Sequence, residues 1–162
     1  MDIVKMPNMG KEEYDRLIRE EYIARIVFQG ENYPYIAPFL YIFDGKYMYF
    51  LSTKYGKKIE YFNQNPYVSV EVDKYNQDLS NYAFVVLSGH LVEVNDASGK
   101  KQIRDHFIRM IKERNLSDNI MIALGHSAQD PTKALALEER NLIWKLVDVK
   151  KITGLKMGTR ES

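Results

Sequence analysis

Two lysines close to two hydroxyl side chains form the pattern in this sequence that is best suited to bind an anion. Ser52 and Thr53 end an apolar and aromatic run, and Gly56 is followed at once by Lys57 and Lys58. The residues after Gly56 have the pattern of a short helix, whose first turn would present unpaired N–H groups and the positive end of the helix dipole. Hydroxyl, amide and ammonium donors together suit a phosphate dianion without any P-loop.

Two simpler interpretations of the same residues are open. Lys57 and Lys58 could be the solvated start of an ordinary helix, and Ser52 and Thr53 could be a plain helix cap. The context favours anion binding, because Pro34 to Asp73 runs through strand, turn, strand, helix and strand in that order. We therefore call Ser52, Thr53, Lys57 and Lys58 the phosphate cradle and treat it as the candidate site.

The histidines do not form a comparable pattern. His126 lies beside Ser127 and near Asp130, which invites comparison with a hydrolytic triad. Adjacent positions rarely bring a histidine and a serine face to face, however, and no nucleophile elbow is present. His90 and His106 are far apart and lack carboxylates at metal-ligand spacing, so the sequence predicts no metal site.

The bulk composition indicates one ordinary globular domain over residues 1–162. Hydrophobic residues make up 45% of the chain and charged residues 28%, and there is no cysteine, which excludes disulfides and thiolate chemistry. A net charge of +1 gives no global field for nucleic acid or an anionic membrane. The first residues lack a secretory signal and no stretch is apolar for long enough to span a bilayer, so we expect a soluble, cytoplasmic protein.

Periodicity predicts a mainly β protein with helices, of the α+β class. Alternating apolar and aromatic runs indicate six antiparallel strands, and three-to-four spacing indicates helices. An Asp-Gly pair predicts a hairpin turn at Asp44-Gly45, and Gly89 predicts a bulge or bend in its strand. The expected strands are Ile23 to Gln29, Tyr35 to Tyr41, Tyr47 to Ser52, Tyr67 to Asp73, Phe84 to Val94 and Asn141 to Val149; the expected helices are Lys11 to Tyr22, Gly56 to Phe62, Ser98 to Arg114 and Asp118 to Leu124.

The order of these motifs resembles the pyridoxamine 5′-phosphate oxidase-like family of FMN-binding split barrels, above all its short members related to nitroimidazole-resistance proteins. The matching elements cover nearly the whole chain in order. The motifs that carry the resemblance are Pro38, Asp44-Gly45, Tyr49-Phe50, Ser52-Thr53, Gly56-Lys57-Lys58, Asn65-Pro66 and Val68-Val70-Val72. The fold that the resemblance implies is a six-stranded antiparallel split β-barrel that forms a homodimer.

The resemblance also implies roles for individual residues. Lys57 and Lys58 would hold the phosphate of FMN, with Ser52 and Thr53 at its phosphate or ribityl end. Trp144 would belong to the family's closing strand, where the partner subunit often completes the flavin pocket. The backbone that would run beside the isoalloxazine ring is that of Ala37, Pro38 and Phe39.

The implied activity is that of a flavin-dependent oxidoreductase acting on a small molecule, with NAD(P)H as one candidate electron donor. Several relatives carry a histidine where this chain has Leu51, and the arginine and histidine that grip substrate in true pyridoxamine phosphate oxidases have no counterpart in the C-terminal LKMGTRES. Vitamin B6 oxidation is therefore not assigned. Three alternatives stay open: a non-catalytic flavin carrier or sensor, a deazaflavin-dependent reductase, and a cofactor-free binding module. The polar segment Gly125 to Lys133 could cover the flavin or the substrate.

Overall fold

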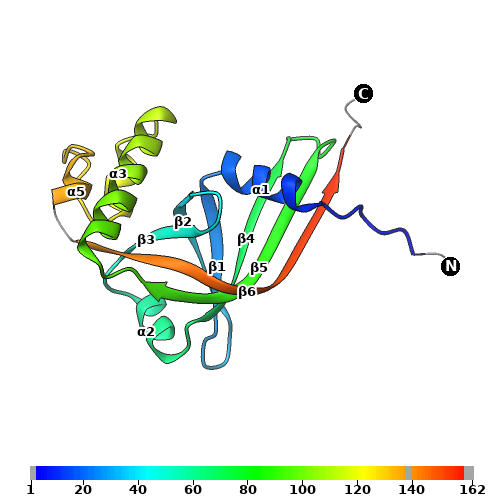
Figure 1. The fold of residues 1–162 in the computed structure, drawn as a ribbon, viewed down its shortest axis with the longest axis horizontal. Coiled ribbons are helices and arrows are strands. Elements are labelled where there is room, and N and C mark those ends of the chain that lie inside the picture. The colour runs from blue at the N-terminus through cyan, green and yellow to red at the C-terminus, as the bar shows by residue number, and fades with distance from the viewer. Residues whose placement is uncertain (1–2, 138–139, 159–162) are drawn as a thin grey trace.

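The fold is an antiparallel β-barrel with helices around it (Figure 1). The computed structural model describes residues 3–137 and 140–158, and within them six strands close in the order β1-β2-β3-β6-β5-β4. This confirms the predicted six-stranded barrel and the α+β class. In chain order the elements are α1 (Lys11–Glu20), β1 (Ile23–Phe28), β2 (Tyr35–Phe43), β3 (Met48–Thr53), α2 (Lys57–Gln64), β4 (Tyr67–Tyr75), β5 (Tyr82–Glu93), α3 (Ala97–Glu113), α4 (Asn119–Ala123), α5 (Ala134–Leu137) and β6 (Asn141–Met157).

The inside of the barrel is filled by the alternate side chains of each strand. In β4 the buried positions are Val68, Val70 and Val72, as the two-residue period of a strand requires. Aromatic rings fill the centre, where Phe28 and Trp144 are both fully buried with ring centroids 5.8 Å apart. The apolar residues whose alternation predicts these strands are thus the residues that fill the barrel interior.

Helices cover only part of the outer surface. A second apolar cluster packs Phe107 of α3 and Met121 of α4 against outward-facing residues of the barrel such as Leu51 and Ile143. Helix α1 closes one end of the barrel, with Ile18 packed into the main core, as expected for the predicted amphipathic N-terminal helix. The outer faces of β1, β4 and β5 carry no helix in Figure 1.

The turn predicted at Asp44-Gly45 is present. Gly45 has a φ of +98°, which favours glycine, and the Asp44 carboxylate accepts hydrogen bonds from the amides of Lys46 and Tyr47 at 2.8 and 2.7 Å. The strands predicted to end at Asp73 and to begin at Phe84 are both longer than expected, because β4 and β5 continue as a ladder to the pair Tyr75 and Tyr82. Helix α5 was not predicted, since four residues carry too little periodicity to identify a helix.

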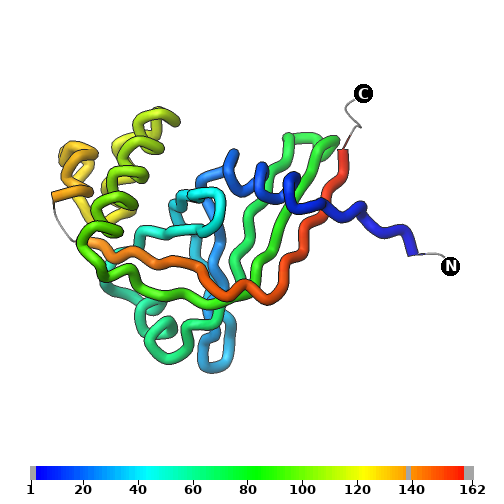
Figure 2. The backbone as a smooth tube through the Cα atoms, in the orientation of Figure 1, coloured from blue at the N-terminus to red at the C-terminus, as the bar shows by residue number. Residues whose placement is uncertain are grey.

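The last strand is much longer than its sequence pattern predicts. The alternation suggests an end at Val149, whereas β6 continues to Met157 and pairs with β3 along its first part and with β5 along most of its length. In Figure 2 this strand is the long bent tube that runs from the helical side of the molecule to the far edge of the barrel. β6 is therefore the strand that closes the barrel.

A bulge allows β6 to bend. Ser88 of β5 pairs with Lys151, but His90 pairs with Val147, so three residues of β6 face one residue of β5. That residue is Gly89, the position at which the sequence predicts a bulge or bend, and a bulge increases strand bending and twist. The prediction at Gly89 is confirmed, and the bulge explains why simple alternation is lost after residue 147.

Both sides of the bulge depend on special backbone positions. A Cβ atom added to Gly89 would lie 2.6 Å from the carbonyl oxygen of Val147, a distance that no ordinary side chain tolerates. Across the bulge Asp148 has a φ of +50°, in the left-handed region that is uncommon for residues other than glycine. The sharp approach of the two strands therefore requires glycine on β5 and a strained residue on β6.

An ionic cluster lies on the outer face that no helix covers. Arg25 of β1 is 3.3 Å from the carboxylate of Asp73 and 3.9 Å from that of Glu71, both on β4. One carboxylate oxygen of Glu71 is buried without a hydrogen-bond partner. Burial, and secondarily the neighbouring Asp73, raise the pKa of Glu71 to about 7, against the opposing effect of Arg25.

We expect Glu71 to make the stability of the protein depend on pH near neutrality. Its pKa is higher in the folded than in the unfolded chain, so the fold favours the protonated carboxyl, and stability falls as pH rises from about 4.5 through 7. Glu71→Gln removes the ionisable group and with it this loss of stability. The free energy of unfolding of the variant, measured by chemical denaturation between pH 5 and 8, should therefore fall less with rising pH than that of the natural protein. Glu93→Gln, an exposed carboxylate on β5, is the matched control. Equal pH dependence of all three proteins would contradict the assignment.

Candidate functional site

The two lysines of the phosphate cradle lie at the start of α2, as predicted. Three residues after the end of β3, Gly56 caps the helix with a φ of +102°, and Lys57 and Lys58 are its first two residues. The first amides bonded within the helix are those of Ile59 and Glu60, which donate to the Gly56 carbonyl. In the described part of the chain the amides of Lys57 and Lys58 have no hydrogen-bond partner, so both remain available to an anion.

Lys58 is held in an unusual environment for an ammonium group. Its Nζ atom lies 5.8 Å from the centre of the Phe39 ring, and the side chain is half-buried. No carboxylate within the described residues comes within 4.0 Å of it. Burial therefore lowers the pKa of Lys58. Lys57, by contrast, is exposed.

The two hydroxyls of the cradle point to the protein backbone. Ser52 and Thr53 are buried, and the Ser52 hydroxyl donates to the Thr53 carbonyl at 2.8 Å, while that of Thr53 lies 3.5 Å from the carbonyl of Tyr55. Neither hydroxyl caps α2, which has no side-chain cap, so the simple helix-cap interpretation of these residues is wrong. To donate to a phosphate, each hydroxyl would have to rotate away from its present acceptor.

The residues predicted to flank the isoalloxazine ring lie on β2 next to the same lysine. Ala37 is half-buried and Pro38 exposed, whereas the Phe39 ring is inside the barrel. The structure thus brings Phe39 and Lys58 together, although they are 19 positions apart in the chain. The backbone of this part of β2 is paired with β1 along its length.

Trp144 is near these residues but is not at the surface. Its ring has no exposed area and packs on Phe39 at 5.8 Å and on Phe62 of α2 at 5.0 Å between centroids, and its indole N–H has no hydrogen-bond partner. A ligand could reach this ring only if a covering side chain such as Phe62 moved. Its predicted role in cofactor binding stays a prediction.

The segment Gly125 to Lys133 packs against the end of β3. A Cβ atom on Gly125 would be 3.5 Å from the Thr53 side chain, so this segment borders the cradle. The His126 ring is fully buried, with Nδ1 3.7 Å from Asp130, and the Ser127 hydroxyl accepts a bond from a neighbouring amide. These side chains do not form the arrangement of a hydrolytic triad.

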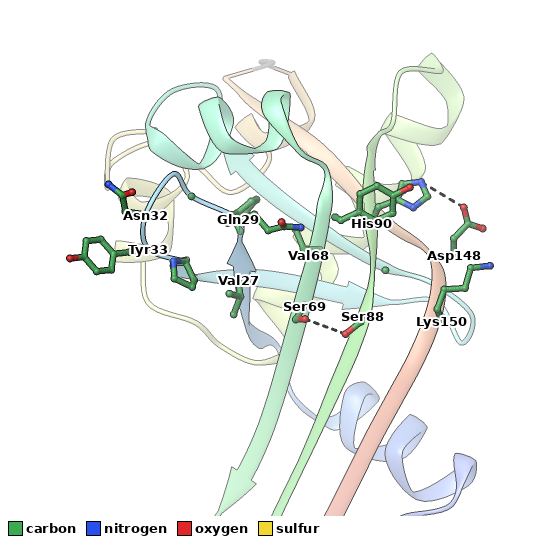
Figure 3. Close-up of a pocket in the computed structure, with 15 residues that line it drawn as sticks. Val27, Gln29, Asn32, Tyr33, Val68, Ser69, Ser88, His90, Asp148 and Lys150 are labelled. Carbon is green, nitrogen blue, oxygen red and sulfur yellow. Dashed lines mark hydrogen bonds and ion pairs between the residues drawn. The ribbon is translucent and has the colours of Figure 1, made fainter.

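A pocket of about 690 Å³ lies elsewhere, where the bulge of β5 and β6 meets the start of β4 and the loop after β1 (Figure 3). None of the eight residues predicted from the sequence lines it. The residues that line it are Val27, Phe28, Gln29, Gly30, Asn32, Tyr33, Pro34, Tyr67, Val68, Ser69, Ser88, Gly89, His90, Asp148 and Lys150.

The polar wall of this pocket is organised around His90. Its Nε2 atom lies 3.6 Å from the Asp148 carboxylate, and its ring contacts that of Tyr67 with centroids 5.3 Å apart. Ser69 and Ser88 share a hydrogen bond of 3.2 Å across the neighbouring strands. Sequence reasoning identified His90 only as a strand histidine. Gly89 was the available clue, since a bulge often re-aims a neighbouring side chain.

The pocket and the cradle are connected through the core. Phe28, which lines the pocket, packs on Phe39 at 6.1 Å and on Trp144 at 5.8 Å. On the side of α2, the Tyr61 ring lies 3.5 Å from the position of a Cβ on Gly30. The pocket and the cradle therefore border the same group of packed aromatic rings.

Neither a metal site nor a membrane-spanning helix is found among the described residues. No group of three or more histidine, aspartate or glutamate side chains is arranged to hold a metal ion. In the same residues, no helix has the length and apolar character needed to cross a membrane.

Comparison with proteins of known sequence or structure gives a consistent result. The chain is 26% identical over 106 residues to an uncharacterised protein of Rhizobium meliloti, covering 65% of this chain and 69% of that one. A FAD-binding protein of Mesorhizobium loti has a similar fold, with a TM-score of 0.70, 21% identity and coverage of 96% of this chain and 100% of the other. For the FAD-binding protein of Mycobacterium smegmatis the TM-score is 0.60, with 14% identity and coverage of 94% and 99%.

The fold shared with these structures is the split barrel that the sequence motifs predict. A sequence profile of the pyridoxamine 5′-phosphate oxidase family matches residues 10–142, which include α1, the first five strands and all the cradle residues. This match covers more than half of the chain, and the chain therefore belongs to the pyridoxamine 5′-phosphate oxidase family.

Proposed function

We propose that this protein binds FMN through the phosphate cradle and acts, as a homodimer, as a flavin-dependent oxidoreductase on a small molecule. The observation that carries the proposal is the state of Lys58. A half-buried ammonium group without an acidic partner is costly in the free protein, and a bound phosphate would offset that cost.

The groups around Lys58 support a phosphate as its partner. The unpaired amides of Lys57 and Lys58 lie at the positive end of the α2 dipole, and the exposed Lys57 side chain adds a second cation. The hydroxyls of Ser52 and Thr53 lie at the end of the preceding strand and could turn toward the same anion. Helix start, two ammonium groups and two hydroxyls would then hold one dianion.

The planar part of the cofactor would lie along β2. The contact of Lys58 with Phe39 places the cradle beside this strand. β3 pairs with β2 only from Tyr41 onward, so the edge of β2 at Phe39 that faces away from β1 has no strand partner among the described residues. The solved relatives named above are FAD-binding proteins, which supports a flavin in general. We propose FMN because the cradle is suited to a single terminal phosphate.

When bound, FMN would supply hydride and single-electron transfer at its ring. The contribution of this chain is to position the phosphate, to limit access of water and to set the charge near the ring. The segment beginning at Gly125, which packs on Thr53, would cover the phosphate end. No acid–base pair of the protein is required for this chemistry.

A second copy of the chain would cover the sheet face that lacks helices. Large exposed side chains on this face include Ile36 on β2 and Tyr67 on β4, each 60% exposed. The helices α3, α4 and α5 pack instead on β2, β3 and the start of β6. Exposed apolar side chains on an uncovered sheet favour association.

We expect Lys57→Ala/Lys58→Ala to weaken FMN binding by about 100-fold, because two charge-assisted contacts to the phosphate are lost. Fluorescence titration of the apoprotein with FMN measures the change. The control is Lys5→Ala/Lys112→Ala, which removes two exposed lysines elsewhere and gives the same net charge. Mass spectrometry of the heat-released cofactor separates FMN from FAD and deazaflavins. If the cradle variant binds FMN as tightly as the natural protein does, the assignment of the site is refuted.

The oxidoreductase activity has its own test. Protein loaded with FMN and kept free of oxygen should lose the visible absorption of its flavin when NADH or NADPH is added, and regain it with an acceptor. Absorption spectroscopy under nitrogen follows both steps. If the flavin stays oxidised with both nucleotides but is reduced by dithionite, the protein is a carrier or sensor and the enzymatic part of the proposal fails.

The molar mass of the protein in solution tests the proposed homodimer. Light scattering coupled to size-exclusion chromatography should give twice the 19.0 kDa of one chain. Ile36→Glu and Tyr67→Glu place charges on the exposed sheet face and should lower the measured mass toward that of the monomer, whereas Leu137→Glu, at an exposed apolar position on α5, should not. A single-chain mass for the natural protein at micromolar concentration would exclude the dimer.

A further inference from the structure

We propose that Asn141, held in place by the buried side chain of Arg104, is a positioning residue for the cofactor site. It keeps the segment from Gly125 to Lys133, which we call the cover segment, closed over the phosphate end of the cradle. This role rests on the proposed FMN function, since FMN is the ligand that the cover segment would retain. Neither Asn141 nor Arg104 belongs to the cradle, and both act through the backbone that they hold.

Arg104 is a charged residue in the interior of the molecule. It is 4% exposed and lies on the buried face of α3, together with Phe107 and Ile111. Its guanidinium donates to the Leu135 carbonyl at 3.1 Å, to the Asn141 side-chain oxygen at 2.5 Å and to the Asn141 main-chain carbonyl at 2.7 Å. These bonds join α3 to α5 and to the start of β6, which lie together at the helical end of the molecule in Figure 1. Because a buried charge is costly unless it is hydrogen-bonded, the guanidinium is fixed in this position.

The chemistry of its neighbours fixes the orientation of the Asn141 side-chain amide. A guanidinium can only donate hydrogen bonds, and a main-chain carbonyl can only accept them. The amide oxygen therefore faces Arg104, and the amide NH₂ group donates to the Leu124 carbonyl at 3.2 Å. Asn141 is 1% exposed, so the loss of either bond would leave a buried polar group unsatisfied.

Asn141 thereby holds the two pieces of backbone that meet at Thr53 of the cradle. Its main chain pairs with Thr53 in the β3–β6 ladder and so positions the end of β3. Its side chain holds the carbonyl of Leu124, the residue directly before Gly125, and a Cβ atom on Gly125 would lie 3.5 Å from the Thr53 side chain. One buried amide therefore fixes both the end of β3 and the start of the cover segment beside it.

The cover segment has few other polar links. The side chains of Ser127 and Asp130 accept hydrogen bonds from amides of the same segment, and the main-chain amides of Gly125 and His126 donate to α4. Neither ring nitrogen of the buried His126 has a hydrogen-bond partner. In the part of the chain that the structure describes, the bond from Asn141 is thus the hydrogen bond that ties the start of this segment to the barrel.

Asn141→Asp is the variant that separates the two partners of this residue. The carboxylate has the shape of the amide and still accepts from Arg104, whose charge keeps it ionised, but it cannot donate to the Leu124 carbonyl and repels it. The variant should therefore stay folded and release the start of the cover segment. Asn8→Asp, at an exposed asparagine beside the last part of β6, introduces the same charge and is the matched control.

Hydrogen exchange of the protein without cofactor, followed by mass spectrometry, tests the positioning directly. The amides of residues 125–133 should exchange about tenfold faster in Asn141→Asp than in the natural protein or in Asn8→Asp, because opening of the segment no longer breaks a buried hydrogen bond. The amides of β4 should keep their exchange rates. Equal exchange of residues 125–133 in all three proteins, or an equal acceleration in β4, would overturn the proposal.

Titration with two flavins tests whether this positioning acts on the phosphate. FMN carries a phosphate that riboflavin lacks, so Asn141→Asp should weaken FMN binding about tenfold and leave riboflavin binding unchanged, whereas Asn8→Asp should alter neither. Arg104→Lys should show the same selective loss, since an ammonium group lacks the planar fork that bonds to both oxygens of Asn141. Unchanged FMN affinity in either variant, or an equal loss for both flavins, would overturn the proposal.

The result can be separated from that of the FMN proposal. If the natural protein binds no FMN, or if Lys57→Ala/Lys58→Ala binds it equally well, the proposed function fails, and the exchange experiment still decides whether Asn141 holds the cover segment. If the cradle variant loses FMN but Asn141→Asp keeps the affinity of the natural protein, the proposed function stands and the role of Asn141 is refuted.

Discussion

The structure depends above all on the ability of one strand to pair along both of its edges. β6 bonds to β3 through the pairs from Thr53–Asn141 to Tyr49–Lys145, and to β5 from Trp144 to Met157. A flat strand cannot follow both neighbours around a narrow barrel, because closure requires tilt and bending. The bulge opposite Gly89 supplies the bend. Without it, the barrel would stay an open sheet with two unpaired edges.

The same constraint explains where polar groups gather. Regular ladder positions alternate between core and surface and leave few places for a binding site, whereas the bulge frees residues 148–150 from the ladder. At the other end, β3 stops at Thr53 and a three-residue turn leads into α2, whose first amides and lysine side chains have no partner among the described residues. Both sites in this molecule thus form where a strand stops being regular.

A group of aromatic rings fills the core next to both the pocket and the cradle. Phe28, Phe39 and Trp144 contact one another at centroid distances near 6 Å, and such tilted arrangements are favourable beyond simple burial. Phe28 belongs to the pocket at the β5–β6 bulge, and the Lys58 ammonium lies over the Phe39 ring, 5.8 Å from its centre. The pocket and the cradle thus border one group of packed rings, although they share no lining residue.

Local chemistry in the sequence was sufficient for much of the architecture. Alternating valines indicated β4, Asp44-Gly45 indicated the hairpin, Gly89 indicated the bulge, and Gly56-Lys57-Lys58 with Asn65-Pro66 bounded α2. Each of these features depends on interactions within a few residues, which is why spacing and residue type predict them.

Contacts between residues far apart in the chain determined the features that local sequence patterns did not predict. The length of β6 after residue 149 depends on pairing with β5, and the hydroxyls of Ser52 and Thr53 turned to the backbone because that end of β3 is buried. His90 and Asp148 are 58 positions apart and meet only through the bulge. No local pattern encodes such a meeting, because the distance between two strands is set by the register of the closed barrel. The sequence by itself therefore determined the strands, the turns and the cationic start of α2, and only the tertiary structure decided which of their side chains face one another.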